Sequence, residues 1–225
     1  VVLLFLSSFL VRCANTTTPQ GGPRDTIPPV LMVATPENYS TKFASKRVFI
    51  EFNEYVQLKD QHKEFFTSPR MKSKPSLSIR GRGVMIDIKD TLAENQTYVL
   101  NFGSSLRDNN EGNPLHSFSY VFSTGEEIDS MWMSGYTADA QKSDSVAKSY
   151  IYFYRADSLA LDTAVRTAEF DSTLLRRAPD AIARAETNGI FLAKNLKPIN
   201  YRIYAFQDKN DNQMYEPGTD MVGIL

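Results

Sequence analysis

The sequence predicts an all-β fold, organised as two consecutive antiparallel β-sandwiches that follow a signal segment and a flexible tether. Short apolar runs with a period of two residues recur along the chain, and Gly, Pro and Asn residues separate them. A polar stretch, EEIDS at 126–130, divides these runs into two groups. The chain has 225 residues and domains usually contain about 100–150, so two domains are expected.

Residues 1–12 (VVLLFLSSFLVR) are predicted to be the hydrophobic region of a signal peptide. At a rise of about 1.5 Å per residue, this stretch is too short to cross a hydrocarbon core of about 30 Å. No Met and no basic region precede it, so we expect residues 1–13 to be a truncated signal peptide. The alternative is a short buried strand or helix.

The segment Leu10-Val11-Arg12-Cys13 resembles a lipobox, the signal of bacterial lipoproteins. The resemblance implies that the thiol of Cys13 is acylated and that this residue becomes the mature N-terminus. Leu10 matches the pattern, whereas Arg12 stands where a small residue is usual. Because Cys13 is the only cysteine, no intrachain disulfide can form. The implied localisation is the cell envelope, as an outer-membrane lipoprotein attached to the membrane by its lipid.

Residues 14–29 are rich in Thr, Pro and Gly, and we expect them to form a solvated tether. The first domain is predicted over residues 30–125. Its expected strands are 30–34, 47–53, 64–67, 77–80, 84–88, 98–102 and 118–123. Seven short strands in about 95 residues are typical of an immunoglobulin-like sandwich.

Local patterns within residues 30–125 support this prediction. Val48, Ile50 and Phe52 alternate with polar neighbours, as expected for a half-buried strand. Gly81-Arg82-Gly83 is typical of a hairpin turn. Leu92 precedes Tyr98 by six residues, which predicts a tyrosine corner, in which the hydroxyl bonds to backbone near the preceding loop.

Three stretches carry a family resemblance: DTIPPVLMVATPEN, RVFIEFNEYVQL and LAENQTYVLNFGSSLRDNNEGNPLHSFSYVFSTG. They resemble the SbsA-like bacterial immunoglobulin-like domain, over about residues 25–125. In combination with a lipid signal and a GGPRDTIPP tether, the chain resembles Bacteroidetes-type lipoproteins that contain such a domain.

The second domain is predicted over residues 131–225, with strands at 131–137, 150–154, 183–187, 190–193, 201–207 and 221–225. Residues 156–182 are expected to form a long loop, and Thr187-Asn188-Gly189 a hairpin turn with positive φ at Asn and Gly. The stretch TNGIFLAKNLKPINYRIYAFQDKNDN resembles the carboxypeptidase-regulatory-like, or transthyretin-like, sandwich. Because the sequence stops within a strand-like run, we expect this domain to be truncated at its C-terminus.

Several function classes are disfavoured. The 25 basic and 26 acidic residues balance, and the basic residues are scattered, so no nucleic-acid partner is expected. His62 and His116 lie in unrelated loops, and no zinc spacing, phosphate loop or G-x-S-x-G motif occurs. Glu51 and Glu54 could form a glycosidase pair, although charges on a solvent-facing strand are the preferred interpretation. We therefore predict no catalytic residues and no enzyme activity.

One loop has the composition of a calcium site. Oxygen-bearing side chains at alternate positions, followed by two carboxylates, resemble the start of a calcium-binding loop; they are Asp208, Asn210, Asn212, Glu216 and Asp220. Gln213 and Thr219 depart from that pattern, and a solvated Asn/Asp turn is the alternative. Calcium is the only cofactor that the sequence suggests. A second polar loop, around Asp108 and Gly112, is expected to be an ordered turn.

Asp-Ser or Asp-Thr followed by an apolar residue or Thr recurs seven times, more often than average composition predicts. Some Gram-negative bacteria attach O-linked glycans at such tripeptides in exported proteins. The candidate sites are Thr26, Thr91, Ser130, Ser145, Ser158, Thr163 and Ser172. The alternative is that these pairs simply favour turns and helix caps.

The preferred functional hypothesis is a lipid-anchored, non-catalytic spacer or interaction module, with a cell-wall or surface glycan or another envelope protein as its partner. The second hypothesis is a carbohydrate- or peptidoglycan-binding accessory module. It requires exposed aromatic residues on one face, and the candidates are Trp132, Tyr136, Tyr152 and Tyr154. The alternative is that they belong to the core, as strand tyrosines and a lone Trp more often do. The third is that the chain is the non-catalytic part of a larger envelope enzyme.

Overall fold

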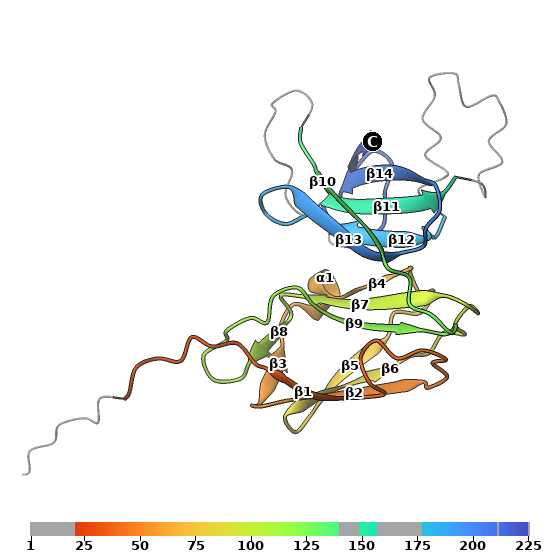
Figure 1. Ribbon diagram of the computed structural model, residues 1–225. Coiled ribbons are helices and arrows are strands. Elements are labelled where there is room, and N and C mark those ends of the chain that lie inside the picture. Colours follow the sequence, from red (N-terminus) through yellow and green to blue (C-terminus); the bar gives the residue numbers. More distant parts are fainter. Residues whose placement is uncertain (1–20, 140–148, 157–176, 211, 225) are drawn as a thin grey trace, which may run out of the picture.

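The computed structural model describes residues 21–139, 149–156, 177–210 and 212–224. This part of the chain contains fifteen strands and one short helix, α1 (Gln61–Glu64). Figure 1 shows two β-domains, one above the other, with β10 (Met131–Tyr136) rising from the first domain into the second. All the strand pairs are antiparallel. The predicted all-β fold of antiparallel sheets is confirmed.

The first domain is a sandwich of two main sheets. One sheet has the order β1 (Leu31–Thr35), β2 (Arg47–Phe52), β6 (Gly83–Asp87) and β5 (Ser76–Arg80). The other has the order β4 (Phe66–Ser68), β7 (Thr97–Gly103) and β9 (Phe118–Ser123). A short ladder of β3 (Val56–Leu58) and β8 (Leu106–Asp108) completes the domain.

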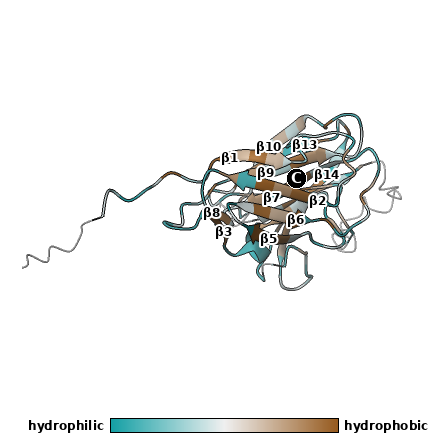
Figure 2. Cartoon of the chain, turned by 90° about the horizontal axis from the view of Figure 1, so that it is seen from below, coloured by the Kyte–Doolittle hydropathy of each residue, from teal (hydrophilic) through white to brown (hydrophobic). Residues whose placement is uncertain are grey.

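The core of the first domain follows the alternation in the sequence. Val48, Ile50 and Phe52 of β2 are fully buried, as predicted. From the opposite sheet, Phe122 stacks on Tyr98, with the ring centroids 5.3 Å apart. Figure 2 shows the hydrophobic colour concentrated along the strands and the hydrophilic colour in many of the loops. Burial of one face of each sheet therefore holds this domain together.

Two turn predictions for this domain are confirmed. The hydroxyl of Tyr98 accepts the backbone N–H of Ala93 at 2.8 Å, which forms the tyrosine corner. Arg80 pairs with Gly83 across a tight turn, and Gly81 adopts a positive φ of 57°.

The second domain packs two sheets face to face. The strand β10 pairs with β13 (Ile190–Leu196), and the larger sheet has the order β12 (Ala181–Arg184), β11 (Ser149–Arg155), β14 (Tyr201–Gln207) and β15 (Met221–Ile224). Ile151 and Phe153 of β11 point between the sheets, where they pack with Phe191 and Leu196 of β13. The opposite side of β11 carries Tyr150, Tyr152 and Tyr154, which are also buried.

Some strand predictions were wrong in position. The strand predicted at 183–187 is β12, which ends at Arg184 and begins at Ala181, inside the predicted loop. Ala181 and Ile182 are buried and pair with β11, and this pairing makes them part of a strand. The sequence around them shows no alternation of apolar and polar residues that would have predicted it. The strand predicted at 64–67 begins only at Phe66, because Glu64 ends α1. Strands β3 and β8 were not predicted, since three residues are too few for a period-two pattern.

The turn at Thr187–Gly189 also differs from the prediction. Gly189 has a positive φ of 81°, whereas Asn188 does not adopt the left-handed conformation. The strands on either side of the turn, β12 and β13, belong to different sheets. This turn therefore carries the chain from one sheet of the sandwich to the other.

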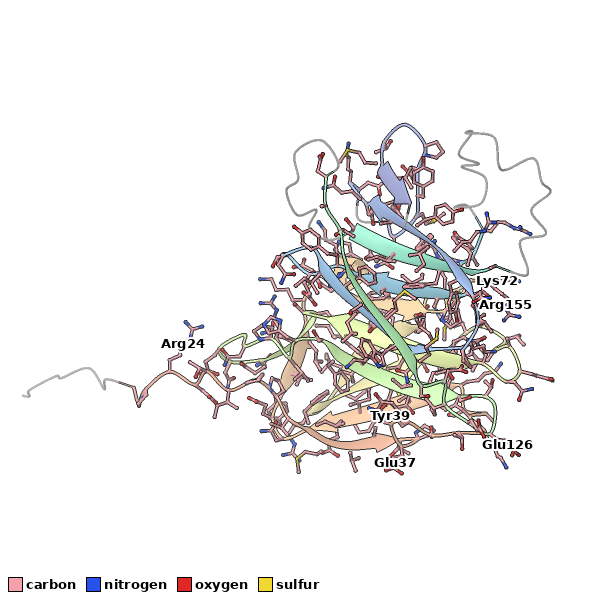
Figure 3. All side chains as sticks on the ribbon, turned by 45° about the horizontal axis from the view of Figure 1, so that its top comes forward. Arg24, Glu37, Tyr39, Lys72, Glu126 and Arg155 are labelled. Atoms are coloured by element: carbon pink, nitrogen blue, oxygen red, sulfur yellow. The ribbon has the colours of Figure 1, made fainter. Side chains whose placement is uncertain are left out.

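Residues 21–29, from the predicted tether, contain no regular secondary structure. Their last part lies against the first domain, because Arg24 donates to the Glu111 carbonyl at 2.9 Å and Asn113 donates to the Asp25 carbonyl at 3.1 Å. Figure 3 shows Arg24 at the side from which the tether leaves the domain. Residues 1–13, including Cys13, lie outside the described residues. In the described part, no helix is both long and apolar enough to span a membrane.

Candidate binding site at the domain junction

Polar contacts fix the two domains against each other. Arg184 of β12 donates to the carboxylate of Glu64, at the end of α1, over an Nη2–Oε2 distance of 2.6 Å. The two side chains are only 17% and 19% exposed, so water screens this ion pair less than a surface pair. Nearby, the hydroxyl of Ser68 accepts the backbone N–H of Ile182 at 2.8 Å.

Apolar contacts also cross the junction. Phe66 of the first domain packs edge-to-face on Tyr150 of the second, with centroids 5.8 Å apart. Phe66 belongs to the same buried cluster as Tyr152, Tyr154 and Ile182. The outer face of β11 is therefore covered in part by Phe66 of the first domain, and the two domains share part of a core.

Hydrogen bonds from both domains also hold the short linker between them. The backbone N–H of Asp129 donates to the Thr97 hydroxyl at 2.9 Å, and Asn195 donates to the Asp129 carbonyl at 3.0 Å. Lys197 donates to the Asn95 carbonyl at 2.8 Å. Both domains thus contribute partners around the polar joint at 126–130.

A cleft of about 500 Å³ lies at this junction. Strands β7 and β9 supply one wall, including Asn101 and Ser119, and β13 supplies the other, including Ile190, Leu192 and Lys194. This size is within the range of ligand-binding clefts, which commonly occur between domains. The cleft is the candidate binding site of the described chain.

The amino-acid sequence carries no local signal for this cleft. Its walls come from segments about 90 residues apart, and no local motif marks them. At its margin, the hydroxyl of Ser104 lies 3.3 Å from Nδ1 of His116, which is an exposed residue. Within the described ranges, no carboxylate hydrogen-bonds to the His116 ring. The pair therefore lacks the third group that orients the base in a nucleophile–base–acid triad.

An exposed apolar face continues from the cleft along β10 and β13. Trp132 is 65% exposed, and Tyr136, Ile190 and Leu192 are each about half exposed. Tyr136 lies opposite Ile190 in the ladder, and Ser134 lies opposite Leu192, so these residues share one face of the two-stranded sheet. We call this surface, formed by Trp132, Tyr136, Ile190 and Leu192, the Trp132 face.

The other two aromatic candidates do not meet the requirement for exposure. Tyr152 is fully buried and Tyr154 is nearly so. Their hydroxyls are also engaged, since Tyr152 donates to the Gln213 carbonyl at 2.7 Å and Tyr154 to the Arg177 carbonyl at 3.2 Å. Burial raises the pKa of both phenols above the ordinary value. These tyrosines are core residues, because β11 is covered on both faces.

The predicted calcium loop is closed by its own hydrogen bonds. The carboxylate of Asp208 accepts the backbone N–H of Gln213 at 2.7 Å, and that of Asp220 accepts the N–H of Glu216 at 2.9 Å. The side-chain amides of Asn210 and Asn212 both donate to the Glu216 carboxylate. The described residues include no group of three or more His, Cys, Asp or Glu side chains placed to hold a metal ion. Calcium binding by this loop stays a prediction.

The second polar loop is an ordered turn, as predicted. The buried carboxylate of Asp108, at the end of β8, accepts backbone N–H groups from Glu111, Gly112 and Asn113 at 2.6, 2.9 and 2.7 Å. Burial alone would raise the pKa of Asp108, but these donors outweigh it and the pKa is lowered.

The predicted modification sites are only partly within the described chain. Thr26, Thr91 and Ser130 are exposed, which leaves them accessible to a glycosyltransferase. Ser145, Ser158, Thr163 and Ser172 lie outside the described residues, as does Cys13. Glycosylation and lipidation stay predictions.

The described chain is built from two β-sandwich domains joined by a packed junction. Within it, residues 25–124 match the family model described as a bacterial Ig-like domain. The match covers the first domain and ends before the linker. A search of curated proteins found no match.

Two solved structures are similar in part. The N-terminal part of the bacterial S-layer protein SbsC has 9% identity and a TM-score of 0.31, covering 87% of this chain and 43% of that one. The major pilin subunit of Bacillus cereus has 10% identity and a TM-score of 0.23, covering 88% of this chain and 66% of that one. The chain thus spans less than two thirds of either protein, and likenesses this weak carry no functional argument.

Proposed function

We propose that the chain is a lipid-anchored protein of the cell envelope, and that its two β-domains form one rigid, non-catalytic spacer or interaction module. The junction carries this proposal. Domains within one chain move relative to each other unless their interface is extensive and apolar. Here Phe66 packs into the core of the second domain, and Glu64 pairs with Arg184 beside it. The bacterial Ig-like domain also fits a structural role without catalysis.

The proposed attachment is through a lipid on Cys13, with the outer membrane as the location. The segment between this residue and the first domain would act as the tether. One acyl chain gives only marginal membrane binding, whereas the several chains of a lipoprotein anchor hold a protein stably. The proposed partners are the membrane, through this anchor, and a glycan or another envelope protein at the domain surfaces.

Replacing Cys13 with serine is expected to abolish lipid labelling and to release the protein from the membrane fraction. The serine hydroxyl cannot form the thioether on which the anchor depends. The complete gene would be expressed in a Gram-negative host fed an alkyne-tagged fatty acid, and labelling would be measured in each fraction. Ser8→Ala is the control, because it changes the same segment and leaves the thiol. Labelling that persists in Cys13→Ser would rule out this anchor.

A glycan-binding role is the second candidate, and the Trp132 face favours it. An exposed Trp and Tyr on one strand, continuous with a cleft that also offers Asn101 and Ser119, match the mixture of aromatic and polar groups in small-molecule sites. Neighbouring exposed apolar side chains of this kind are typical of interaction surfaces. A role as the non-catalytic part of a larger envelope enzyme has no supporting observation of its own and stays a prediction.

Trp132→Ala is expected to weaken binding to a cell-wall or surface glycan roughly thirtyfold. Covering a large apolar side chain contributes about 2 kcal/mol, and 1.4 kcal/mol corresponds to a factor of ten. Binding would be measured on a glycan array and then by calorimetry with the best ligand. Tyr55→Ala is the matched control, because Tyr55 is 64% exposed and lies away from β10 and β13. No binding by the unaltered protein would favour the spacer alone.

A further inference from the structure

A second, smaller pocket at the junction is lined by basic side chains. Its volume is about 140 Å³, and it lies between the segment that follows β4 and the second domain. The first domain contributes Arg70, Lys72 and Lys74. The second contributes Tyr150 and the side of the 208–220 loop that carries Asn212 and Gln213. Among the described residues that line this pocket, none carries a carboxylate.

Two of the three cations in this pocket, Lys74 and Arg70, contact neutral groups. The ammonium group of Lys74 donates to the His62 carbonyl at 3.0 Å and approaches Oε1 of Gln213 at 3.5 Å. It also lies 5.8 Å from the centroid of the Phe65 ring. Arg70 donates through one nitrogen to the hydroxyl of Tyr152 at 3.3 Å. The other nitrogens of the Arg70 guanidinium have no bonded partner among the described residues.

The charge of Asp208 acts on Tyr150 in the wall of this pocket, but among the described residues no carboxylate pairs directly with its cations. None of Arg70, Lys72 and Lys74 forms an ion pair with a described carboxylate. Desolvation, followed by the charge of Arg70, lowers the pKa of Lys74 to about 8. These two cations repel each other beside a small cavity. An anion bound between them would offset this repulsion.

The walls of the pocket are fixed by contacts that span the junction. Gln213 adopts a positive φ of 61°, and its side-chain amide donates to the carbonyls of His62 and Phe65, each at 3.0 Å. Figure 3 shows Lys72 at the level of the boundary between the two domains. The pocket therefore exists only when the domains are docked, and its basic groups are positioned before any ligand arrives.

We propose that this pocket binds a small oxyanion, a phosphate, sulfate or carboxylate group, between Arg70 and Lys74, with the exposed Lys72 beside them. Arg offers a planar set of donors that matches such oxyanions, and Lys adds a point charge. The volume accommodates one such group rather than an extended ligand. Because the ligand contacts both domains, its binding would also stabilise the docked arrangement.

The test uses the full chain and three probes: inorganic phosphate, sulfate and acetate, each compared with sodium chloride at equal ionic strength. The pKa of the Lys74 ammonium would be followed by NMR. Saturating phosphate is expected to raise this pKa from about 8 toward the ordinary lysine value, because a bound anion favours the charged form. The three probes would show whether the site prefers tetrahedral or planar oxyanions.

Arg70→Gln and Lys74→Gln are each expected to weaken phosphate binding about tenfold, which is the scale of one charge-assisted hydrogen bond. Lys59→Gln removes the same charge from an exposed position of the first domain and should leave binding unchanged within about twofold. Equal weakening in this control would show that only overall charge matters, and would overturn the proposal. A pKa of Lys74 that responds to none of the three anions would also overturn it, without requiring any variant to fold.

Discussion

Replacing Asp108 with alanine is expected to lower the free energy of unfolding by about 2–4 kcal/mol. The carboxylate is 1% exposed and accepts three backbone N–H groups, from Glu111, Gly112 and Asn113. Alanine would leave these donors without an acceptor, and each lost acceptor costs about 1 kcal/mol or more unless water replaces it. Urea denaturation followed by tryptophan fluorescence and circular dichroism measures the change.

Two further variants separate this effect from a general loss of charge. Asp108→Asn keeps one acceptor oxygen but turns an NH₂ group toward a backbone donor, so an intermediate loss is expected. Asp87→Ala removes an aspartate of the same domain whose ion pair with Arg47 lies at the surface. That change is expected to cost less than about 1 kcal/mol. Equal losses in Asp108→Ala and Asp87→Ala would contradict the assigned role of Asp108.

The effect of Asp108 should depend on pH with a definite sign. Its pKa in the folded protein is lowered, so the carboxylate stabilises the fold fully above the pKa of the unfolded chain. This stability is lost as the pH falls through the folded-state pKa. The difference between the unaltered protein and Asp108→Ala should therefore be constant near neutral pH and shrink below about pH 4.

Much of the first domain was predictable because its information is local. Val48, Ile50 and Phe52 alternate with polar residues, and alternation determines which face of a strand is buried. The tyrosine corner was likewise visible, since Tyr98 and the loop whose backbone N–H its hydroxyl accepts are a few residues apart. The ordered turn at Asp108 was predicted, but the number of donors that its carboxylate accepts depends on how the loop folds back.

The junction could not be predicted, because its contacts join distant segments. Glu64 and Arg184 are 120 residues apart, and nothing near either residue identifies the other as its partner. One local signal was available. The run Ser149–Arg155 (SYIYFYR) is continuous and aromatic, which is typical of a strand buried on both faces. For Tyr152 and Tyr154 the core alternative is the correct one, because both side chains are buried.

The burial of both faces of β11 explains why the two domains act together. One face of that strand packs between the sheets of its own domain, and the other packs against Phe66 of the first domain. If the domains separated, Phe66 and the part of Tyr150 that it covers would be exposed to water, at about 25 cal/mol for each Å² of apolar surface. The Glu64–Arg184 pair lies beside this contact and would lose its partial protection from solvent.

Gly103→Ala is expected to lower the free energy of unfolding by about 2–4 kcal/mol and to loosen the junction. Gly103 ends β7 with a positive φ of 56°, a conformation that costs an alanine about 1–2 kcal/mol. An added Cβ would also lie 2.6 Å from Oε2 of Glu64 and 2.7 Å from Nη2 of Arg184. The methyl group must therefore displace the ion pair, whose loss we expect to add about 1–2 kcal/mol.

Gly81→Ala provides a matched control, because its φ of 57° is nearly the same and no atom lies within 4 Å of its added Cβ. The free energy of unfolding of Gly81→Ala should fall only by the cost of placing an alanine at a positive φ. Small-angle scattering and urea denaturation would compare the two variants, with Glu64→Gln as an independent disruption of the pair. An increased radius of gyration, or separate unfolding of the domains, is expected for Gly103→Ala and not for Gly81→Ala. If both variants lose the same stability and keep the same shape, the Glu64–Arg184 contact does not hold the domains together.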